Sequence, residues 1–251
     1  MVGYGTLPSD LDKAARRGEP SYVWRAGQER RLRLVLQAAG DLIEGRVLDN
    51  GCGVGEYLAR LADGSGDAHG LEFDLDRARA AAARARRATV VYAAGERLPY
   101  ASVSFDVVLS HEVLEHVFDD RAAAAESVRL LRPGGRLVLF VPNRGYPFET
   151  HGIFWRGRYR FGNIPMVNYL PRRWRDSLAP HVRAYRARDV ARLFEGLPVT
   201  ILDRRFLFGG YDNLIARWPR LGRRLRDLLQ ALERTPLRAF GLSHFWVLEK
   251  R

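Results

Sequence analysis

Short apolar runs alternate with segments of helical periodicity between residues 46 and 141. The runs 46–50 (RVLDN), 68–73 (AHGLEF) and 105–110 (FDVVLS) are typical of buried strands, and amphipathic or alanine-rich stretches separate them. Strands that alternate with helices indicate right-handed βαβ units, in which the strands pair in parallel. The alternation therefore predicts an α/β fold with a doubly wound parallel sheet.

The pattern changes after Pro142. Residues 143–180 are aromatic, basic and rich in glycine and proline, and a stretch of this length without a period predicts a cap over a site. Two late strands, 199–208 and 243–250, predict a hairpin that completes a seven-stranded, mostly parallel sheet with an antiparallel last strand. The expected divisions are 1–44 (a helical lid), 45–143 (the core), 144–186 (the inserted cap) and 187–251 (completion of the sheet, with a basic amphipathic helix).

Charge is divided unevenly along the 251 residues. Residues 1–143 contain 19 Lys+Arg against 20 Asp+Glu, whereas residues 144–251 contain 22 against 9. Such an asymmetry favours an acidic partner, which is nucleic acid, an anionic lipid surface or a phosphorylated substrate. A solvated, arginine-rich face explains the same composition equally well.

The cellular compartment is suggested by what the sequence lacks. Cys52 is the single cysteine, so no disulfide can form within the chain. No window approaches the roughly 18–20 apolar residues that a membrane span needs. The first twenty residues contain no apolar run of the kind found in signal peptides. A cytoplasmic location is therefore expected.

A glycine-rich turn follows the first expected strand. Residues 47–61 (VLDNGCGVGEYLARL) place three glycines between a strand and a helix, directly after Asp49. At the carboxyl edge of a parallel sheet, such a turn lets a nucleotide-like ligand approach the backbone. The phosphate-binding pattern G-x-x-x-x-G-K-[ST] is missing, and Glu56 replaces the last glycine of the dinucleotide pattern. A carboxylate beside the glycines favours a ligand with an ammonium group and a sulfonium.

Four segments in order resemble the class I S-adenosylmethionine-dependent methyltransferases of the type 11 kind. These segments are 47–55 (VLDNGCGVG), 69–74 (HGLEFD), 95–117 (GERLPYASVSFDVVLSHEVLEHV) and 130–143 (LLRPGGRLVLFVPN). The resemblance implies a Rossmann-like fold with S-adenosylmethionine as cofactor, bound in the core 45–143. It identifies these cofactor-binding residues: Asp49, Gly51, Cys52, Gly53, Gly55, Glu72, Phe73, Gly95, Glu96, Ser110 and His111.

Two of these assignments concern the adenosine part of the cofactor. Glu72 would accept hydrogen bonds from both ribose hydroxyls, for which a carboxylate offers two oxygens. The family often has an acid where this chain has Ala94. Adenine recognition would therefore depend on the backbone near Gly95 and on Glu96.

A second constellation lies at residues 110–117 (SHEVLEHV). Positions three and four apart share a helix face, so Glu112, Glu115 and His116 are expected to point together. Such ligands suit Mg²⁺, Mn²⁺ or Zn²⁺. The E-x-x-E-H pattern resembles that of the small-RNA 2′-O-methyltransferases and the ubiquinone-pathway O-methyltransferases, where it implies a divalent ion at the acceptor oxygens. His181 stands where the RNA enzymes have a later histidine, and it completes the candidate metal ligands.

The candidate catalytic residues are His116, His111 and His181. A bound metal would lower the pKa of an acceptor hydroxyl, and the enzyme would hold the resulting oxygen in line with the sulfonium methyl. Alternatively, His116 is a general base or packs structurally, and His181 caps the next helix. His111 would line the methionine pocket beside Ser110.

Three functions remain open at this point. The first is methylation of a hydroxyl on a small-molecule, sugar or lipid-linked acceptor. The second is 2′-O-methylation of RNA, which the basic second half favours, although no compact RNA-binding module is visible. The third is regulation by a protein that binds S-adenosylmethionine without turnover.

Three further segments have two readings each. Tyr22, Trp24 and Arg25 form either an aromatic lid over the cofactor or ordinary core packing. Residues 148–162 (FETHGIFWRGRYRFG) suit stacking on a sugar, a nucleotide or a lipid headgroup, or they pack inward. The leucine- and arginine-rich helix expected at 213–234 is predicted to be interrupted at Pro219. It either contacts an anionic membrane or, as is more common, packs its leucines on the domain.

Overall fold

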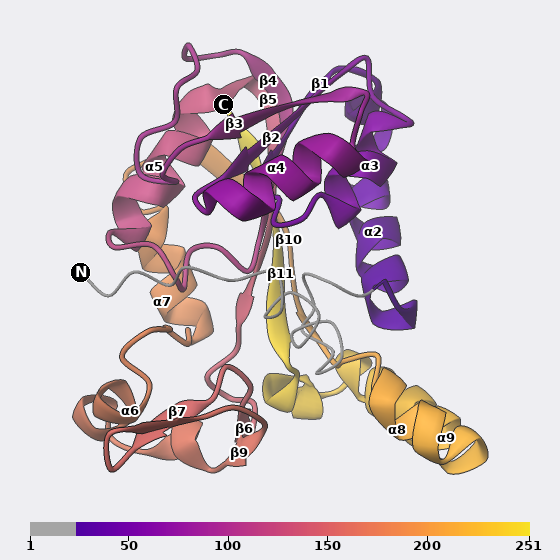
Figure 1. The fold of residues 1–251 in the computed structure, drawn as a ribbon, viewed down its shortest axis with the longest axis vertical. Coiled ribbons are helices and arrows are strands. Elements are labelled where there is room, and N and C mark those ends of the chain that lie inside the picture. Colours follow the sequence, from indigo (N-terminus) through magenta and orange to yellow (C-terminus); the bar gives the residue numbers. More distant parts are fainter. Residues whose placement is uncertain (1–23) are drawn as a thin grey trace.

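The computed structural model describes residues 24–251 and contains a seven-stranded sheet flanked by helices, with two smaller lobes beyond one end of the strands (Figure 1). The strand order is β10-β11-β5-β4-β1-β2-β3. The strands of this sheet are β1 (Arg46–Asn50), β2 (Asp67–Glu72), β3 (Ala88–Tyr92), β4 (Phe105–His111), β5 (Leu131–Pro142), β10 (Val199–Leu207) and β11 (Ser243–Lys250). Strands β1 to β5 pair in parallel, and β11 is antiparallel to both of its neighbours. The expected Rossmann-like sheet with an antiparallel last strand is confirmed.

Helices cover both faces of the sheet (Figure 1). One face carries α2 (Ala26–Ala39), α3 (Glu56–Ala62) and α4 (Leu75–Arg84), with the short 3-10 helix η1 (Gly40–Glu44) after α2; the other carries α5 (Asp120–Leu130) and α7 (Ala187–Leu193). Successive residues alternate between the faces: Val47 packs with α2 and α3, and Leu48 with α5 and α7. Because both faces are buried, the strands read as nearly continuous apolar runs.

The first lobe is the cap that follows β5. It contains two small two-stranded sheets, in which β6 pairs with β9 and β7 with β8. Its elements are β6 (Phe148–Glu149), β7 (Ile153–Trp155), β8 (Arg158–Arg160), β9 (Ile164–Pro165), η2 (Val167–Tyr169) and α6 (Arg172–Leu178). A small apolar cluster around Ile153 and Val182 forms its core. In the cap, the buried Arg175 donates hydrogen bonds to Glu149 across 2.6 Å and to the Val182 carbonyl.

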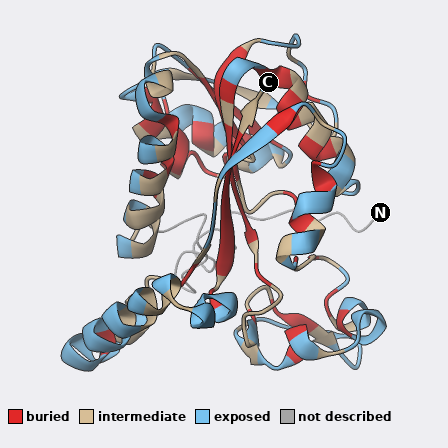
Figure 2. Ribbon diagram, turned by 180° about the vertical axis from the view of Figure 1, so that it is seen from behind, coloured by how far each residue is buried: buried red, intermediate tan, exposed pale blue. Residues whose placement is uncertain are grey.

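The second lobe is an arm between β10 and β11. It consists of α8 (Asp212–Arg217) and α9 (Pro219–Ala231), followed by η3 (Leu232–Arg234) and η4 (Pro236–Phe240). The break that was expected at Pro219 is present. The leucines of this segment do not pack on the domain, which was the more common of the two expected arrangements. Leu221 and Leu228 of α9 are 62% and 61% exposed, and most of the arm is open to solvent (Figure 2).

The expected lid is only partly within the described residues, because Tyr22 and everything before Trp24 lie outside them. Trp24 packs edge-on against Tyr57, with ring centroids 5.0 Å apart, and the Arg60 guanidinium lies over its ring. Arg25 lines the central cavity described below. Among residues 24–251, no helix has the length and apolar character required to cross a lipid bilayer.

Candidate active site

Buried polar side chains meet where β1 and β4 end. Asn50 lies opposite Ser110 in the parallel register, and Asp49 lies opposite Leu109. Asp49, Asn50 and Ser110 are at most 2% exposed. The Asp49 Oδ2, both amide atoms of Asn50 and the Ser110 Oγ have no hydrogen-bond partner among the described residues. Buried polar atoms are nearly always satisfied in proteins, so these groups indicate a polar ligand at the strand ends.

Asp49 has an unusual protonation equilibrium. Burial raises its pKa to about 7, and the negative charge of Glu72 contributes to the rise. A cationic ligand next to Asp49 would favour the ionised form and offset this cost. The chemistry of the strand-end pocket therefore matches the ammonium and sulfonium of S-adenosylmethionine.

The glycine turn is held in place by backbone hydrogen bonds. The N–H groups of Gly51 and Cys52 both donate to the Leu71 carbonyl, and the Gly53 N–H donates to Glu72 Oε2 across 2.8 Å. Gly51 has a φ of +79°, and a Cβ there would lie 2.3 Å from the Val113 Cγ2. A side chain is therefore excluded at Gly51 both by the backbone conformation and by Val113.

Most of the expected cofactor residues line one wall of a large cavity of about 1680 Å³. Glu72 is buried, and its Oε1 accepts from the N–H groups of Phe73 and Asp74. Phe73 is 71% exposed and presents an open ring, and Glu96 accepts from the Phe118 N–H across 2.6 Å. The predicted cofactor residues that line the cavity are Asp49, Gly51, Cys52, Gly53, Glu72, Phe73, Gly95, Glu96 and His111. Gly55 and Ser110 are not among the residues that line the cavity; Ser110 lies buried behind it at the end of β4.

Arg31 of α2 lines the cavity next to the strand ends, and nothing in the sequence distinguishes it from its arginine neighbours. Its Nη1 lies 2.6 Å from both the His111 Nε2 and the Glu112 Oε1, and its Nη2 donates to Ser243. Burial and the charge of Arg31 lower the pKa of His111 to about 4, so this imidazole is neutral near pH 7. Burial alone would raise the pKa of Glu112, but the charge of Arg31 outweighs it and keeps the pKa well below its usual range.

Residues 112–116 form a turn rather than the expected helix, and Glu112 has a φ of +58°. Glu112 pairs with Arg31 and does not belong to the group of potential metal ligands that contains Glu115 and His116. Strained backbone of this kind is concentrated at functional sites. The expected pattern of Glu112, Glu115 and His116 on one helix face is therefore corrected.

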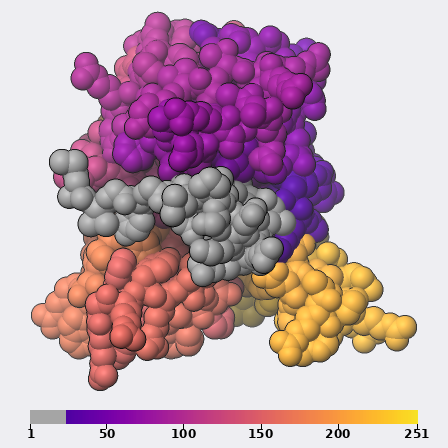
Figure 3. Space-filling model, viewed as in Figure 1, coloured from indigo at the N-terminus to yellow at the C-terminus, as the bar shows by residue number. Residues whose placement is uncertain are grey.

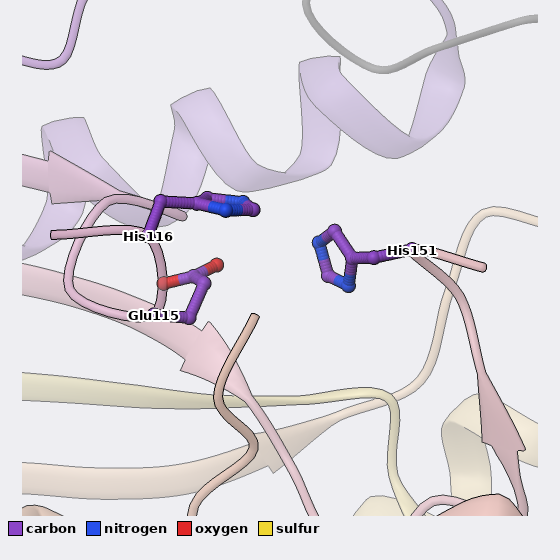
Figure 4. A group of neighbouring side chains, drawn as sticks. All are labelled: Glu115, His116 and His151. Atoms are coloured by element: carbon purple, nitrogen blue, oxygen red, sulfur yellow. The ribbon is translucent and has the colours of Figure 1, made fainter. Parts of the chain in front are cut away.

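The turn instead brings Glu115 and His116 together with His151 from the cap (Figure 4). One potential ligand atom from each of the three lies within 4.8 Å of the others. Glu115 is 1% exposed, and neither of its carboxylate oxygens has a hydrogen-bond partner among the described residues. Burial, with a contribution from Glu112, raises the pKa of Glu115 well above its usual range. The group has the composition of a divalent-cation site, two imidazoles and one carboxylate.

His116 and His151 face the cavity from opposite sides. Desolvation by the surrounding wall and the nearby His151 lower the pKa of His116 to about 4, so its imidazole is neutral. The His151 Nδ1 lies 3.2 Å from Glu149 Oε1. If Glu149 accepts this hydrogen bond, the proton is on Nδ1 and Nε2 is available to a ligand or a proton. Hydrogen bonds from His151 and the charge of Arg175 outweigh the effect of burial and lower the pKa of Glu149 to about 2.

His181 lies next to this group without joining it. Its Nε2 lies 3.1 Å from the His151 carbonyl, and its own carbonyl lies 3.3 Å from the His116 Nδ1. Its position therefore orients the other two histidines. The sequence identified the histidine-containing cap segment 148–162 but not His151 as a partner of Glu115, and the only local signal is the acid two residues earlier, Glu149.

Aromatic side chains from the cap and the arm form the far wall of the cavity. Tyr146, Tyr159 and Phe161 belong to the cap, and Phe208 and Tyr211 precede the arm. The cavity exceeds the roughly 300–1,000 Å³ that is typical of a single small-molecule site. It therefore has room for a cofactor and a second molecule together.

Comparisons with known proteins agree with this geometry. Residues 48–139 match the model of a methyltransferase domain family. A ubiquinone biosynthesis O-methyltransferase of Mesorhizobium japonicum is 31% identical over 183 residues, which are 70% of this chain and 67% of that protein. A probable S-adenosylmethionine-dependent methyltransferase of Mycolicibacterium smegmatis is 33% identical over 139 residues, which are 55% of this chain and 54% of that protein. Against this and several other curated relatives, the chain spans about half of their length.

Solved structures share the fold. An S-adenosylmethionine-dependent methyltransferase of Mesorhizobium loti superposes with a TM-score of 0.61 at 19% identity, over 90% of this chain and 98% of that chain. One conclusion follows from the unpartnered polar atoms at the strand ends, the hydrogen bond from the glycine turn to Glu72, the family match and the relative that the chain covers over two thirds of its length. The chain belongs to the S-adenosylmethionine-dependent methyltransferases.

Proposed function

We propose that this chain transfers the methyl group of S-adenosylmethionine to a hydroxyl oxygen of a small or lipid-linked acceptor. The proposal is supported by a cavity with two chemically different walls, polar at the strand ends and aromatic at the cap and arm. The Mesorhizobium japonicum relative is an O-methyltransferase by name, which supports oxygen as the methylated atom.

The strand-end wall would hold the cofactor. The unpartnered atoms of Asp49 and Asn50, which line the cavity, fit its polar groups, and the exposed ring of Phe73 offers a surface for its base. When bound, S-adenosylmethionine supplies an electrophilic methyl group on a cationic sulfur. The neutral His111 and the fixed Arg31–Glu112 pair close this wall toward the acceptor.

Glu115, His116 and His151 would hold a divalent metal ion at the border between the two walls. The observation that carries this assignment is the buried, unpartnered carboxylate of Glu115 directed at two imidazoles. A bound metal would supply Lewis acidity and lower the pKa of an acceptor hydroxyl. Glu149 and Arg175 would fix the orientation of His151, as outer partners of metal-bound histidines commonly do.

A metal-free variant of the mechanism uses the same residues. In that variant, His151, oriented by Glu149, accepts the proton of the hydroxyl through its Nε2. The two variants differ in one measurable respect, because only the first requires a divalent ion.

The test compares Glu115→Gln with Glu195→Gln, an exposed glutamate remote from the cavity. Both variants and the parent are treated with a chelator, supplied with S-adenosylmethionine and a catechol as probe, and assayed for S-adenosylhomocysteine and O-methylated product with and without Mg²⁺, Mn²⁺ or Zn²⁺. We expect metal-dependent turnover in the parent and in Glu195→Gln, and at least a roughly hundredfold loss in Glu115→Gln, with binding of S-adenosylhomocysteine intact.

Three results would contradict parts of the proposal. If turnover changes with neither chelator nor added metal, no metal ion takes part in the reaction, and His151 acts as the base. If only nitrogen or carbon atoms are methylated across a panel of acceptors, the proposed hydroxyl acceptor is wrong. Tight cofactor binding without turnover of any acceptor favours a regulator.

A further inference from the structure

The arm, residues 212–231, presents an apolar stripe to solvent. Trp218, Leu221, Leu225 and Leu228 are 50%, 62%, 36% and 61% exposed. Their spacing of three, four and three residues places them along one side of α9. A helix on the surface of a globular protein normally turns such a stripe toward the core. Here the stripe lies on a lobe that projects away from the sheet (Figure 3).

The arm is a folded unit in spite of this exposure. Gly222 is the one buried residue of α9, and a Cβ there would lie 2.7 Å from the Ile215 Cα of α8. The two helices therefore pack backbone to backbone. The start of α8 is fixed to α2, because the Gly27 N–H donates to Asp212 and Arg25 donates to Asn213. The stripe is exposed because the arm is held away from the sheet, not because its helices lack partners.

Arginines occupy the rest of the exposed surface of α9. Arg224 borders the stripe between Leu221 and Leu228, and Arg220 and Arg223 project from the other sides of the helix; all three are exposed. None of these three forms an ion pair with any residue in 24–251, in contrast to Arg226, which pairs with Asp227. A narrow apolar stripe bordered by uncompensated guanidinium groups is the pattern of helices that lie in the headgroup region of a membrane.

We propose that the arm binds the surface of an anionic lipid bilayer, with the stripe inserted among the lipid chains and the arginines at the phosphates. The 13 residues of α9 are too few to span a bilayer, so the helix would lie along the surface. A lipid surface fits the arm better than two other partners. A second copy of the arm would bring the same arginines together, and nucleic acid would leave the leucines in water.

The position of the arm has a consequence for the acceptor. Asp212, Asn213 and Leu214 of α8 line the central cavity, and α9 follows directly. Binding of α9 to a bilayer would therefore bring the cavity close to the lipid surface. This part of the inference rests on the proposed function, and it assigns the acceptor to hydroxyl compounds with a lipid tail.

The test uses the full chain and vesicles of phosphatidylcholine with or without phosphatidylglycerol. We expect cosedimentation with the anionic vesicles only, weakened by salt. Leu221→Ser/Leu228→Ser should reduce the partition coefficient at least tenfold, whereas Leu202→Ser, at a leucine of β10 that is 47% exposed, should leave it unchanged. Arg223→Gln/Arg224→Gln should reduce it by a similar factor, and Arg204→Gln, an exposed arginine of β10, should not.

Circular dichroism and binding of S-adenosylhomocysteine, measured on the same samples, establish that each variant is folded. Equal partition of the parent and of both arm variants would overturn the proposal. So would dimerisation through the stripe, or RNA binding that depends on the arginines, in the absence of vesicle binding. Vesicle binding without any methyl transfer would leave the arm's role intact and remove only the assignment of the acceptor.

Discussion

The two walls of the central cavity are held by different forces. The wall that we propose for the cofactor, the cofactor wall, consists of residues at the ends of β1, β2 and β4, and the parallel register places Asn50 beside Ser110. The wall that we propose for the acceptor, the acceptor wall, consists of cap strands of two or three residues and of the arm, and it depends on side-chain contacts such as Arg175–Glu149. Sheet hydrogen bonds thus fix the first wall, whereas a few side chains fix the second. Such a division lets one fold keep its cofactor and change its acceptor.

The largest expected effect breaks the acceptor wall alone. Arg175→Met removes the cationic partner of the buried Glu149 and leaves it only the hydrogen bonds of His151. Loss of one partner of a buried pair costs about 3–5 kcal/mol. Turnover should fall strongly while the affinity for S-adenosylhomocysteine stays the same, as measured by calorimetry. The matched control on the same helix is Arg172→Met, whose pair with Asp176 is exposed and worth at most about 1 kcal/mol. Equal effects of the two substitutions would show that the buried pair does not support the cap.

The next effect breaks the cofactor wall alone. Gly51 and Gly134 both have a φ of +79°, but a Cβ at Gly134 meets nothing within 4 Å. Alanine at either position costs about 1–2 kcal/mol in backbone strain. Only Gly51→Ala also displaces Val113, so it should weaken binding of S-adenosylhomocysteine by about thirtyfold or more, and Gly134→Ala should leave binding unchanged. A comparable loss of affinity in both would mean that strain alone explains the glycine.

A smaller effect concerns the pH dependence of the cofactor wall. The pKa of Asp49 in the folded protein is about 7, against 3.8 for the free side chain, so its contribution to stability is lost as the pH rises from about 4 to 7. Without ligand, Asp49→Asn should therefore raise the melting temperature at pH 8. A ligand whose ammonium group lies beside Asp49 requires the ionised form. With a pKa of about 7, the ionised fraction rises about fivefold from pH 6 to 7, so the dissociation constant of the parent for S-adenosylhomocysteine should fall by about the same factor.

In Asp49→Asn, the affinity should be low and should no longer vary over this pH range. A parent whose affinity is constant from pH 6 to 8 would refute the role of Asp49 as the titrating group.

The smallest expected effect concerns the rigidity of the cofactor wall, which the labelling rate of Cys52 tests. Burial raises the pKa of the Cys52 thiol, which is 7% exposed beneath the glycine turn. A thiol reagent should therefore label the folded chain at pH 8 no faster than global unfolding exposes it, and urea should accelerate the labelling. Fast labelling in native buffer would show that the turn opens on its own.

Much of the fold follows from local patterns in the sequence. The alternation of strands and helices, the change after Pro142 and the break at Pro219 all appear in the structure where the sequence predicts them. The residues predicted for cofactor binding lie at or behind one wall because parallel strands end at the same edge of the sheet. For these features, neighbours in the sequence determine neighbours in space.

Contacts between distant segments were decided by the tertiary structure. Residues 112–116 form a turn rather than the expected helix, and Glu112 pairs there with Arg31, which lies about eighty residues earlier in the chain. His151 reaches Glu115 only through the path of the cap. The exposure of the α9 leucines depends on how α8 is anchored to α2. Periodicity identifies the apolar side of a helix, but only the packed chain determines whether that side meets protein or remains open.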